Sequence, residues 1–401
     1  MNALIIIVHL IIVVGPATFA SVYDVTQYGA DPTGRLPSTE AIAAAINAAA
    51  AKNGGTVHFP RGQYSTGPIE LKSGIYVDFA DGCQITFLDD PKLYPALTVK
   101  LPDGRMRHLP YTPLIRGMGT NNIHIRGNAV IDGQGPIWWD RLHPPSSRPE
   151  SIHIWASNDI VLESFHIQNS PMFNVHIVDS NNIEINGISI RNPPDYHGKG
   201  PNTDGINLNS VQNVHIANVN VATGDDCIAL NGNTDSRGKK PTQNILIENS
   251  HMTAGHGGVS IGSVTSGGLR NITVRNCYFN NTVRGLFIKT NRKRGGTITD
   301  IHYHDIVMTN VQKEGIAIST MYDDKDYSKK PITATTPIIN NIDYNNIRGT
   351  CGRNTIMLVG LPESPVESIT INGFDVTSKK GVLLNNTRNI IINGKLQLDS
   401  V

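Results

Sequence analysis

The sequence predicts an all-β fold, a single-stranded right-handed parallel β-helix of about ten turns with an N-terminal capping helix. Three observations support this prediction. A polar residue followed by alternating apolar positions recurs along the chain, the strands are short and rich in Val and Ile, and no helical periodicity separates one strand from the next. In such a solenoid each turn stacks on the next at about 4.8 Å, and the inward apolar residues form one continuous core.

The recurring pattern marks the turns. Its first apolar residues are Ile123, Ile160, Ile183, Val214, Ile245, Ile272, Ile301, Ile342, Ile369 and Ile390. Each of these markers directly follows Asn, Asp or Ser, side chains that bond to nearby backbone at bends; Asn and Asp also tolerate left-handed conformations. We therefore interpret the recurring polar residues as structural.

One amphipathic segment, residues 38–52, predicts the helix that covers the open end of the stack. Ser38 is placed to cap its start, and Gly54 with Gly55 to end it. Its apolar stripe at helical spacing consists of Ile42, Ala45, Ile46 and Ala49. Insertions at 193–201 and 322–337 interrupt the strand pattern, and loops of this length on a rigid scaffold often build a binding cleft.

Composition and cysteine spacing exclude several classes of protein. A length of 401 residues suggests two or three domains, but a solenoid makes residues 21–401 one elongated domain. Lys plus Arg number 34 and Asp plus Glu 33, so the chain lacks the basic excess of a nucleic-acid binder. Four scattered cysteines are too few for a disulfide scaffold or a zinc site, although one or two bridges can form in an oxidising compartment.

Residues 1–20 predict a secretory signal peptide. They carry no charge, residues 4–14 are apolar apart from His9, and the small residues ending at Ala20 resemble a signal-peptidase site. The alternative is an uncleaved membrane anchor, which needs about 20 apolar residues, and this run is shorter. We expect a mature chain that begins near Ser21 and is secreted, extracellular and monomeric, with no membrane partner.

Three successive turns place acidic residues and a histidine in one register. Asp225 and His256 each lie 11 residues after the marker of their own turn (214 to 225 and 245 to 256), so they should stack one turn apart. Aligning the strands that follow places Asp204 beside Asp226. Backbone capping would explain an isolated pair of aspartates, but it does not explain the shared register with Asp204 and His256.

Crowded carboxyl groups suit the hydrolysis of a glycosidic bond. That reaction needs one protonated carboxyl to protonate the leaving oxygen and one carboxylate to activate water or attack the anomeric carbon. Since three adjacent carboxylates cannot all ionise cheaply, the pKa of one of them rises, and that group can serve as the acid.

With these residues the chain resembles the polygalacturonases, the pectin-degrading glycoside hydrolases of family 28. The central motifs, in the family's order and spacing, are Asn202-Thr203-Asp204-Gly205, Gly224-Asp225-Asp226-Cys227, Gly255-His256-Gly257 and Ile288-Lys289. Upstream landmarks are Tyr28-Gly29-Ala30-Asp31, Ile131-Asp132-Gly133-Gln134-Gly135, Trp138-Trp139 and Asn169-Ser170-Pro171. The resemblance covers nearly the whole mature chain.

The resemblance implies an inverting mechanism that requires no metal or cofactor. In that mechanism Asp225 corresponds to the general acid, while Asp204 and Asp226 together activate the attacking water. His256 matches the family histidine that tunes the proton state of the acid. Inversion leaves room for a water between the acid and the base.

The resemblance also implies which residues bind the substrate. Asn202 and Lys289 match substrate-binding positions, and Tyr322 matches the tyrosine at the cleft, with a loop anchor as the alternative. One residue departs from the family, because its Arg-Ile-Lys triplet reads Phe287-Ile288-Lys289 here. Arg284 should not replace the missing Arg, since residues three apart on a strand point to opposite faces. Phe287 would offer a flat apolar surface to a sugar ring.

Several alternatives remain open at this point. The partner is expected to be an acidic plant cell-wall polysaccharide, either homogalacturonan or rhamnogalacturonan, and Phe287 raises the second substrate and a non-catalytic pectin-binding paralogue. A pectate-lyase-type eliminase would use Ca²⁺ and an arginine base, which the set of acids does not favour. The run of Lys289, Arg292, Lys293 and Arg294 predicts a basic rim for the polysaccharide. Cleavage inside or at the end of a chain depends on loops that the sequence does not place.

Overall fold

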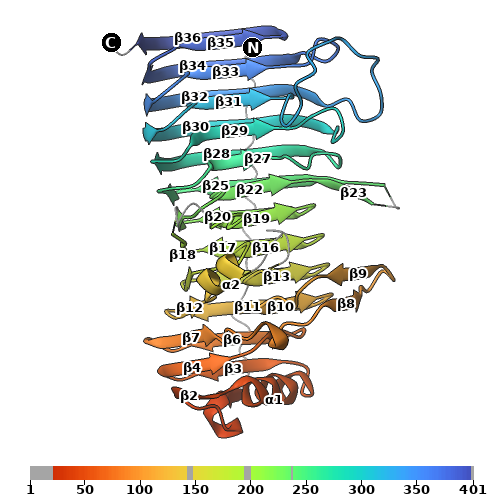
Figure 1. The fold of residues 1–401 in the computed structure, drawn as a ribbon, viewed down its shortest axis with the longest axis vertical. Helices are drawn as coiled ribbons and strands as arrows, with labels where there is room; N and C mark the ends of the chain where they lie inside the picture. Colours follow the sequence, from red (N-terminus) through yellow and green to blue (C-terminus); the bar gives the residue numbers. More distant parts are fainter. Residues whose placement is uncertain (1–20, 142–147, 194–199, 236–237, 399–401) are drawn as a thin grey trace.

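The computed structural model describes residues 21–141, 148–193, 200–235 and 238–398, and its fold is the predicted right-handed parallel β-helix (Figure 1). The proposed leader, 1–20, and residues 194–199 of the first predicted insertion lie outside the described residues. Within the described ranges, no helix is long and apolar enough to cross a membrane.

The larger sheet, which we call sheet A, contains 21 strands in two columns. The first column consists of β1 Val22–Asp24, β3 Gly55–Phe59, β6 Ile75–Phe79, β11 Asn121–Gly127, β14 Asn158–Glu163, β17 Asn181–Asn186, β20 Gln212–Ala217, β25 Thr242–Glu248, β28 Leu269–Asn280, β30 Thr297–Val311, β32 Ile338–Cys351, β34 Val366–Ser378 and β36 Thr387–Leu398. The second column consists of β2 Thr33–Pro37, β4 Gly62–Thr66, β7 Cys83–Phe87, β12 Val130–Asp132, β15 His166–Gln168, β18 Ser189–Arg191, β21 Asn220–Ala222 and β26 His251–Met252. From β28 onward, single long strands run through both columns.

The second large sheet, which we call sheet B, contains eleven parallel strands and carries the candidate site. Its strands are β5 Ile69–Glu70, β10 Ile115–Met118, β13 Ile152–Trp155, β16 Val175–Val178, β19 Ile206–Asn209, β22 Ile228–Asn231, β27 Gly257–Ile261, β29 Arg284–Lys289, β31 Ile316–Ser319, β33 Ile356–Val359 and β35 Val382–Asn385. Each strand pairs with the equivalent strand of the next turn, so a side chain on one turn has a counterpart about 4.8 Å away on the next.

The ten sequence markers stack in one column of sheet A. Ile123 pairs with Ile160, Ile160 with Ile183, and the pairing continues turn by turn to Ile369 with Ile390. All but Ile390, which is partly buried, belong to the continuous apolar core. The predicted repeat is therefore confirmed as the structural repeat.

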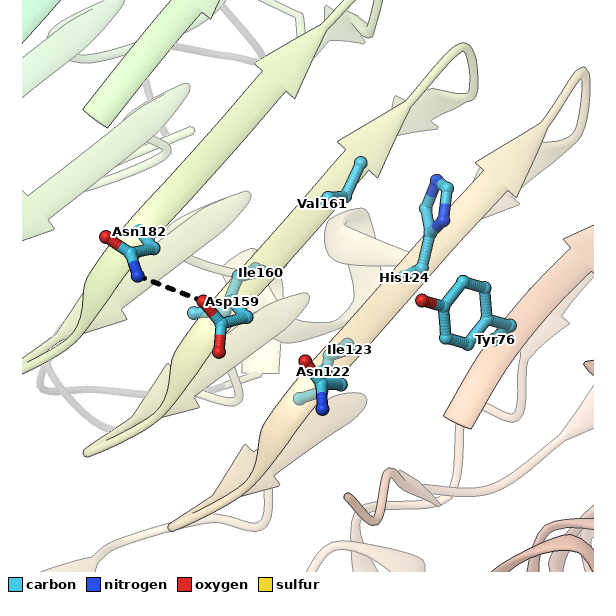
Figure 2. Close-up of a pocket in the computed structure, with 8 residues that line it drawn as sticks. All are labelled: Tyr76, Asn122, Ile123, His124, Asp159, Ile160, Val161 and Asn182. Atoms are coloured by element: carbon cyan, nitrogen blue, oxygen red, sulfur yellow. Dashed lines mark hydrogen bonds between the residues drawn. The ribbon is translucent and has the colours of Figure 1, made fainter. Parts of the chain in front are cut away.

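The polar residue before each marker turns the chain at a corner. All ten of these residues have left-handed backbone, with φ between 52° and 59°. Several of their side chains bond from one turn to the next and form a ladder; Figure 2 shows Asn182 Nδ2 donating to Asp159 Oδ1 over 3.0 Å. Farther along, Asn244 Nδ2 donates to Asn213 Oδ1 over 2.9 Å. The structural interpretation of these residues is confirmed.

The first turns of the β-helix lack the repeated polar residue of the sequence pattern, because glycine occupies the corner position there. Tyr76 pairs with Thr56 on one side and with His124 on the other, so the counterparts of Asn122 are Gly54 and Gly74. Both glycines have positive φ, 120° and 74°, and a Cβ on Gly54 would lie 2.5 Å from the carbonyl oxygen of Gly74. Sheet B accordingly contains one strand more than the ten turns expected.

The capping helix α1, Thr39–Ala50, lies at the N-terminal end of the stack and buries the predicted stripe (Figure 1). Its ends differ from the prediction. The Ser38 hydroxyl accepts a hydrogen bond from the Asp31 N–H over 3.0 Å and makes no bond to the helix. Asn53 takes the left-handed position after the helix, and the Gly54 N–H then reaches the Ala49 carbonyl over 3.0 Å. This is a Schellman ending, with Asn where glycine is commoner.

Several short elements were not predicted. They are η1 Val25–Tyr28, η2 Pro91–Leu93, α2 Gly135–Arg141, and two hairpins, β8 Leu97–Lys100 with β9 Met106–Leu109, and β23 Asn233–Asp235 with β24 Gly238–Lys240. Both hairpins and the insertion at 322–337, which follows β31 as predicted, project on the same side of the stack (Figure 1). All four cysteines are free and buried.

Candidate active site

The candidate site lies on the outward face of sheet B, where the segments before β19 and β22 carry the aspartates. Ile206 pairs with Ile228, so residue 204 lies beside residue 226. The Gly205 N–H donates to the Asp226 carbonyl over 2.9 Å, and a Cβ on Gly205 would lie 2.4 Å from the Cys227 carbonyl oxygen. The glycine of the first motif therefore allows the two aspartate segments to pack together, and the predicted register is confirmed.

Asp225 and His256 stack one turn apart, as their spacing predicts. The His256 N–H donates to the Asp225 carbonyl over 2.9 Å, and His256 Nδ1 lies 3.0 Å from Asp225 Oδ1. The imidazole is the more open partner, because 57% of its side chain is exposed against 20% of the Asp225 side chain. Asp225 still exposes a fifth of its side chain, and a group that gives a proton to a substrate oxygen needs such access.

Asp204 is buried and has one strong neutral donor. Asn207 Nδ2 donates to Asp204 Oδ2 over 2.7 Å. Burial, followed by the negative charges of Asp225 and Asp226, raises the pKa of Asp204 well above its ordinary value. Asp204 therefore retains a proton under conditions in which an exposed aspartate is ionised.

Asp226 is held by donors that favour a negative charge. Ser260 Oγ donates to its Oδ1 over 2.7 Å, and Lys289 Nζ to its Oδ2 over 2.7 Å. Burial would lower the pKa of Lys289, but the charge and hydrogen bond of Asp226 outweigh it and raise that pKa. The ammonium thus remains protonated beside the carboxylate.

The carboxyl with the raised pKa is not that of Asp225, the residue that corresponds to the family's general acid. Burial would raise the pKa of Asp225, but the hydrogen bond and charge of His256, with the charge of Lys289, outweigh it and lower that pKa. The hydrogen bond that the protonated imidazole donates to Asp225 in turn raises the pKa of His256. One carboxyl does have a raised pKa, as expected, but it is Asp204. The proton beside Asp225 is carried by the imidazole.

Three of the predicted substrate-binding residues lie together. The rings of Phe287 and Tyr322 meet edge to face with centroids 6.4 Å apart. Lys289 Nζ lies 5.2 Å from the Phe287 centroid and 5.3 Å from the Tyr322 centroid. Since Lys289 also bonds to Asp226, this group adjoins the carboxyls.

The expectation that Arg284 points away from Phe287 is wrong. The Arg284 guanidinium carbon lies 4.6 Å from the Phe287 ring centroid, and Nε lies 2.8 Å from the buried carboxylate of Glu314. Strand alternation fixes where Cβ points, but Arg284 is the first residue of β29, and its long side chain turns back over the ring. A guanidinium therefore lies beside residue 287 although Arg is absent there.

Asn202 lies two residues before Asp204 and is engaged by a residue that the sequence did not single out. Arg148 Nη2 donates to the Pro201 carbonyl over 2.6 Å and to Asn202 Oδ1 over 3.3 Å. Only 3% of Arg148 is exposed. The buried guanidinium fixes the segment that leads into the first aspartate motif.

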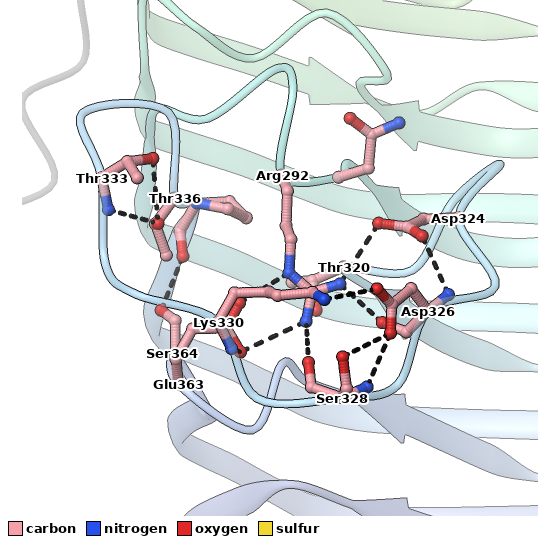
Figure 3. Close-up of polar contacts among 12 residues, drawn as sticks. Arg292, Thr320, Asp324, Asp326, Ser328, Lys330, Thr333, Thr336, Glu363 and Ser364 are labelled. Atoms are coloured by element: carbon pink, nitrogen blue, oxygen red, sulfur yellow. Dashed lines mark hydrogen bonds and ion pairs between the residues drawn. The ribbon is translucent and has the colours of Figure 1, made fainter.

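Arg292 does not belong to a free basic rim as predicted. Figure 3 shows it inside the loop that follows β31, where its guanidinium binds the Glu363 carboxylate at 2.6 Å. It also donates to the carbonyls of Asp326 and Ser328 over 2.6 and 2.9 Å, and lies 3.3 Å from the Asp324 carboxylate. Arg292 therefore fastens the loop that begins with Tyr322.

Two groups of described residues have donor atoms spaced closely enough for a metal ion. Glu150, His153 and His176 form one, on the segment before β13, on β13 and on β16, and the other consists of His302, His304 and Asp343 on sheet A. In both groups the imidazoles already contact a carboxylate. The sequence-based expectation of a reaction without metal stays a prediction.

Asn207 and Ser260 are functional candidates that sequence reasoning missed. Both occupy the outward column of sheet B, and each donates to a carboxyl of the site. Their signal was present, because each is a polar residue between two apolar residues of a strand aligned with the others. A polar residue at an outward strand position beside the acids is therefore itself a functional candidate.

Comparison with known proteins assigns the family. A model described as glycosyl hydrolases family 28 matches residues 58–393, and one for rhamnogalacturonase A/epimerase, pectate lyase-like, matches residues 22–77. A probable polygalacturonase of Vitis vinifera is 28% identical over 87% of this chain and 73% of its own length. A probable endopolygalacturonase I of Aspergillus flavus is 30% identical over 59% of this chain and 63% of its own, slightly under two thirds.

A solved structure agrees with the sequence comparisons. The hyperthermoactive exopolygalacturonase from Thermotoga maritima superposes with a TM-score of 0.81 at 28% identity, over 93% of this chain and 92% of that one. Since the family model spans more than half of the chain, the resemblance drawn from the motifs is confirmed. The chain belongs to family 28 of the glycosyl hydrolases and is a glycoside hydrolase.

Proposed function

We propose that this hydrolase is a polygalacturonase that cleaves α-1,4-linked galacturonic acid in pectin with inversion. The observation that carries the proposal is the convergence of Asp204, Asp225 and Asp226 from two adjacent turns, with His256 from the third turn 3.0 Å from Asp225. The similarity to proteins named polygalacturonase supports the substrate class.

Asp204 and Asp226 activate the attacking water in this proposal. They lie side by side, and the pKa of Asp204 is raised by burial and by the neighbouring negative charges, while the Lys289 ammonium lies 2.7 Å from the Asp226 carboxylate. Lys289 and Ser260 orient the Asp226 carboxylate, while Asn207 orients Asp204. A water held between the two carboxyls can therefore lose a proton as it attacks the anomeric carbon.

Asp225 delivers the proton to the leaving oxygen, with His256 as its reservoir. The pair shares one proton, which rests on the imidazole in the free enzyme because the pKa of His256 is raised and that of Asp225 is lowered. When negative charge develops on the leaving oxygen, the proton of His256 passes to Asp225 and Asp225 protonates that oxygen, which leaves His256 neutral. His256 is thus a positioning and proton-holding residue.

Positive charge beside the acids supports an anionic substrate. Lys289 and the guanidinium of Arg284 flank the Phe287 ring, and Tyr322 closes the group. We assign to Arg284 the contact with the galacturonate carboxylate that the family's Arg makes from position 287. Asn202 binds substrate from the turn before, where Arg148 holds it. With this guanidinium available, Phe287 gives no reason to prefer rhamnogalacturonan or a binding protein without turnover.

The cellular setting belongs to the same proposal. The uncharged apolar segment 1–20 supports secretion, and pectin, an extracellular polysaccharide, is met outside the cell. We propose that residues 21–401 act as one monomeric catalytic domain.

The test is product analysis on polygalacturonate and rhamnogalacturonan side by side, in excess chelator, with Asp225→Asn as the control. We expect new reducing ends from polygalacturonate and no unsaturated product absorbing in the ultraviolet. Ultraviolet absorbance with Ca²⁺ dependence would make the protein a lyase. Faster cleavage of rhamnogalacturonan would overturn the substrate assignment.

A further inference from the structure

The β8–β9 hairpin lies across the outward face of sheet B at its N-terminal half. Its base is at the start of the strands, where the Thr112 N–H donates to the Pro95 carbonyl over 2.9 Å, three residues before β10 begins. Its tip is at their end, because Leu101 belongs to a buried cluster against which Met118, the last residue of β10, packs. A hairpin of four-residue strands has the length needed to cross strands that are also four residues long.

The tip is anchored on two further strands. Leu101 is buried in a small apolar cluster with Trp155 of β13 and Val178 of β16. Arg105 Nη2 lies 2.6 Å from Asp179 Oδ2, and Lys240 of the β23–β24 hairpin lies 3.0 Å from the same oxygen. The crossing is therefore held by apolar burial and by an ion pair that joins both hairpins.

The hairpin covers the outward face of β13 and leaves β16 next to its edge. The Arg107 guanidinium carbon lies 4.0 Å above the Trp155 ring, and the His153 side chain beside it is only 1% exposed. On the next strand the His176 side chain keeps 13% exposure, and its ring meets the Phe173 ring edge to face with centroids 5.0 Å apart. Glu150 contacts both imidazoles.

Only a short part of the outward face of sheet B lies between the β8–β9 hairpin and the three aspartates. β13 pairs with β16, and β16 with β19, where Asn207 bonds to Asp204. Two strand steps amount to about 10 Å, and the hairpin already covers the first strand. A sugar unit in a polysaccharide spans about one step, so one or two units fit between the barrier and the bond that is cleaved.

The proposed catalytic roles fix which end of the substrate meets the barrier. Of the two aspartates that activate the water, Asp204 lies one turn before the acid Asp225, and His256, which holds the acid's proton, lies one turn beyond it. The leaving part of the chain is on the side of the acid, toward β27 and β29. The part that keeps the attacked anomeric carbon therefore extends toward β16, with its non-reducing end at the hairpin.

We propose that the β8–β9 hairpin closes the cleft and that His176, Glu150 and Arg107 bind the non-reducing terminal galacturonate, so that the enzyme releases mono- or digalacturonate from chain ends. This inference rests on the proposed function, whose residues define the direction of the substrate. The His176 imidazole can donate a hydrogen bond to a terminal hydroxyl, and the Glu150 carboxylate can accept one. The Arg107 guanidinium offers a positive charge to the uronate carboxylate.

The first test follows wild-type protein on polygalacturonate and on oligogalacturonides labelled at the reducing end. We expect mono- and digalacturonate from the earliest time, a slow fall in viscosity, and a label that stays on the longest fragment. An early mixture of intermediate oligomers with a rapid fall in viscosity would overturn the inference while leaving the proposed function intact. If no new reducing ends form, the proposed function itself fails.

A shortened hairpin provides the second test. Replacing residues 98–108 by Asn-Gly joins Leu97 to Leu109, which are partners across the hairpin, through a two-residue turn. Removing the barrier should produce oligomers of three or more units, several-fold above the wild-type proportion. An unchanged product pattern from this folded variant would contradict the inference, and if the variant fails to fold, the wild-type assay still decides.

Point variants separate recognition at the terminus from a structural effect. His176→Gln should raise KM for short oligogalacturonides several-fold more than it lowers kcat. The control is His108→Ala on β9, whose ring bonds to Thr98 and lies on the hairpin itself. Equal kinetics of His176→Gln and wild type would remove His176 from the terminal site.

Discussion

The inward and outward faces of sheet B are built from the same strands and follow different rules. On four successive turns the inward residues are Ile206, Ile228, Val259 and Leu286, all apolar and fully buried. The outward residues at the next position are Asn207, Ala229, Ser260 and Phe287. The inward face repeats because each turn must complete the core of its neighbours, whereas the outward face is free to vary.

This difference separates stability from activity in the molecule. Inward positions fix the register, and the register in turn brings Asp204 beside Asp226 and His256 beside Asp225. Outward positions contribute little to the core and supply the donors of the site. Substitutions on the two faces should therefore have effects of different kinds, even when they are adjacent in sequence.

The largest effect is expected at the acid. Asp225→Asn preserves the shape of the side chain but cannot donate the proton, so kcat should fall by roughly 10² to 10⁴-fold. The free energy of unfolding should change by less than about 1 kcal/mol, because the lost partner, His256, is largely exposed. Turnover above a tenth of the wild-type value would remove Asp225 from the acid role.

The matching substitution on the inward face is Leu230→Ala in β22. Leu230 is fully buried and pairs with Leu208 and Ile261, so its truncation leaves a cavity and should cost about 2–5 kcal/mol of stability. Denaturant titration measures this cost, and kcat measured well below the unfolding transition should remain near the wild-type value. A large loss of kcat in the folded variant would show that the two faces are coupled.

Features that depend only on the spacing of residues along the solenoid could be predicted from the sequence. The marker column, the left-handed corners and the pairing of Asp204 with Asp226 all depend on one repeat and on strand register. The first turns were missed because Gly54 and Gly74 take a position that Asn or Asp takes later.

Features that depend on long side chains or on burial could not be predicted in this way. Arg284 and Arg292 have several rotatable bonds, so the position of Cβ does not determine which carboxylate the guanidinium reaches. The acid with the raised pKa could not be chosen either. All three aspartates are crowded, and only the structure shows that Asp204 lacks the cationic partner that Asp225 has.

The proposed contact of Arg284 with the substrate is the next test of the outward face. Arg284→Gln should lower kcat/KM on polygalacturonate, and the loss should correspond to about 1.5–3 kcal/mol of transition-state stabilisation. This is the usual range for a hydrogen bond to a charged group. Arg353→Gln is the control, since Arg353 lies 3.3 Å from the same Glu314 carboxylate and makes no stack on Phe287. Equal losses in both variants would mean that Arg284 acts only by neutralising Glu314.

The pH profile tests the proton held beside the acid. The hydrogen bond with Asp225 raises the pKa of His256, so the pair keeps its proton above pH about 6.5, and wild-type activity should decline only beyond that value. His256→Gln should move this alkaline limb below pH 6.5 and reduce the maximum about tenfold. His215→Gln is the control, because Glu184 and Glu248 raise the pKa of His215 on sheet A, away from the site. Identical profiles for wild type and His256→Gln would exclude the reservoir role.

The smallest effect is expected at a corner of sheet A. Asn244→Gly removes the amide bonds to Asn213 and from Asn271, of 2.9 and 2.8 Å, but glycine adopts the φ of 59° without strain. The expected cost is about 0.5–1.5 kcal/mol of stability, with kcat unchanged. Asn244→Ala should cost about 1–2 kcal/mol more, because a Cβ disfavours the left-handed conformation and alanine offers no local hydrogen bond in return. Denaturant titration of both variants separates the backbone part from the ladder. Equal stability of the glycine and alanine variants would mean that the ladder alone, and not the left-handed corner, selects Asn at this position, which would leave the glycines at 54 and 74 without their present explanation.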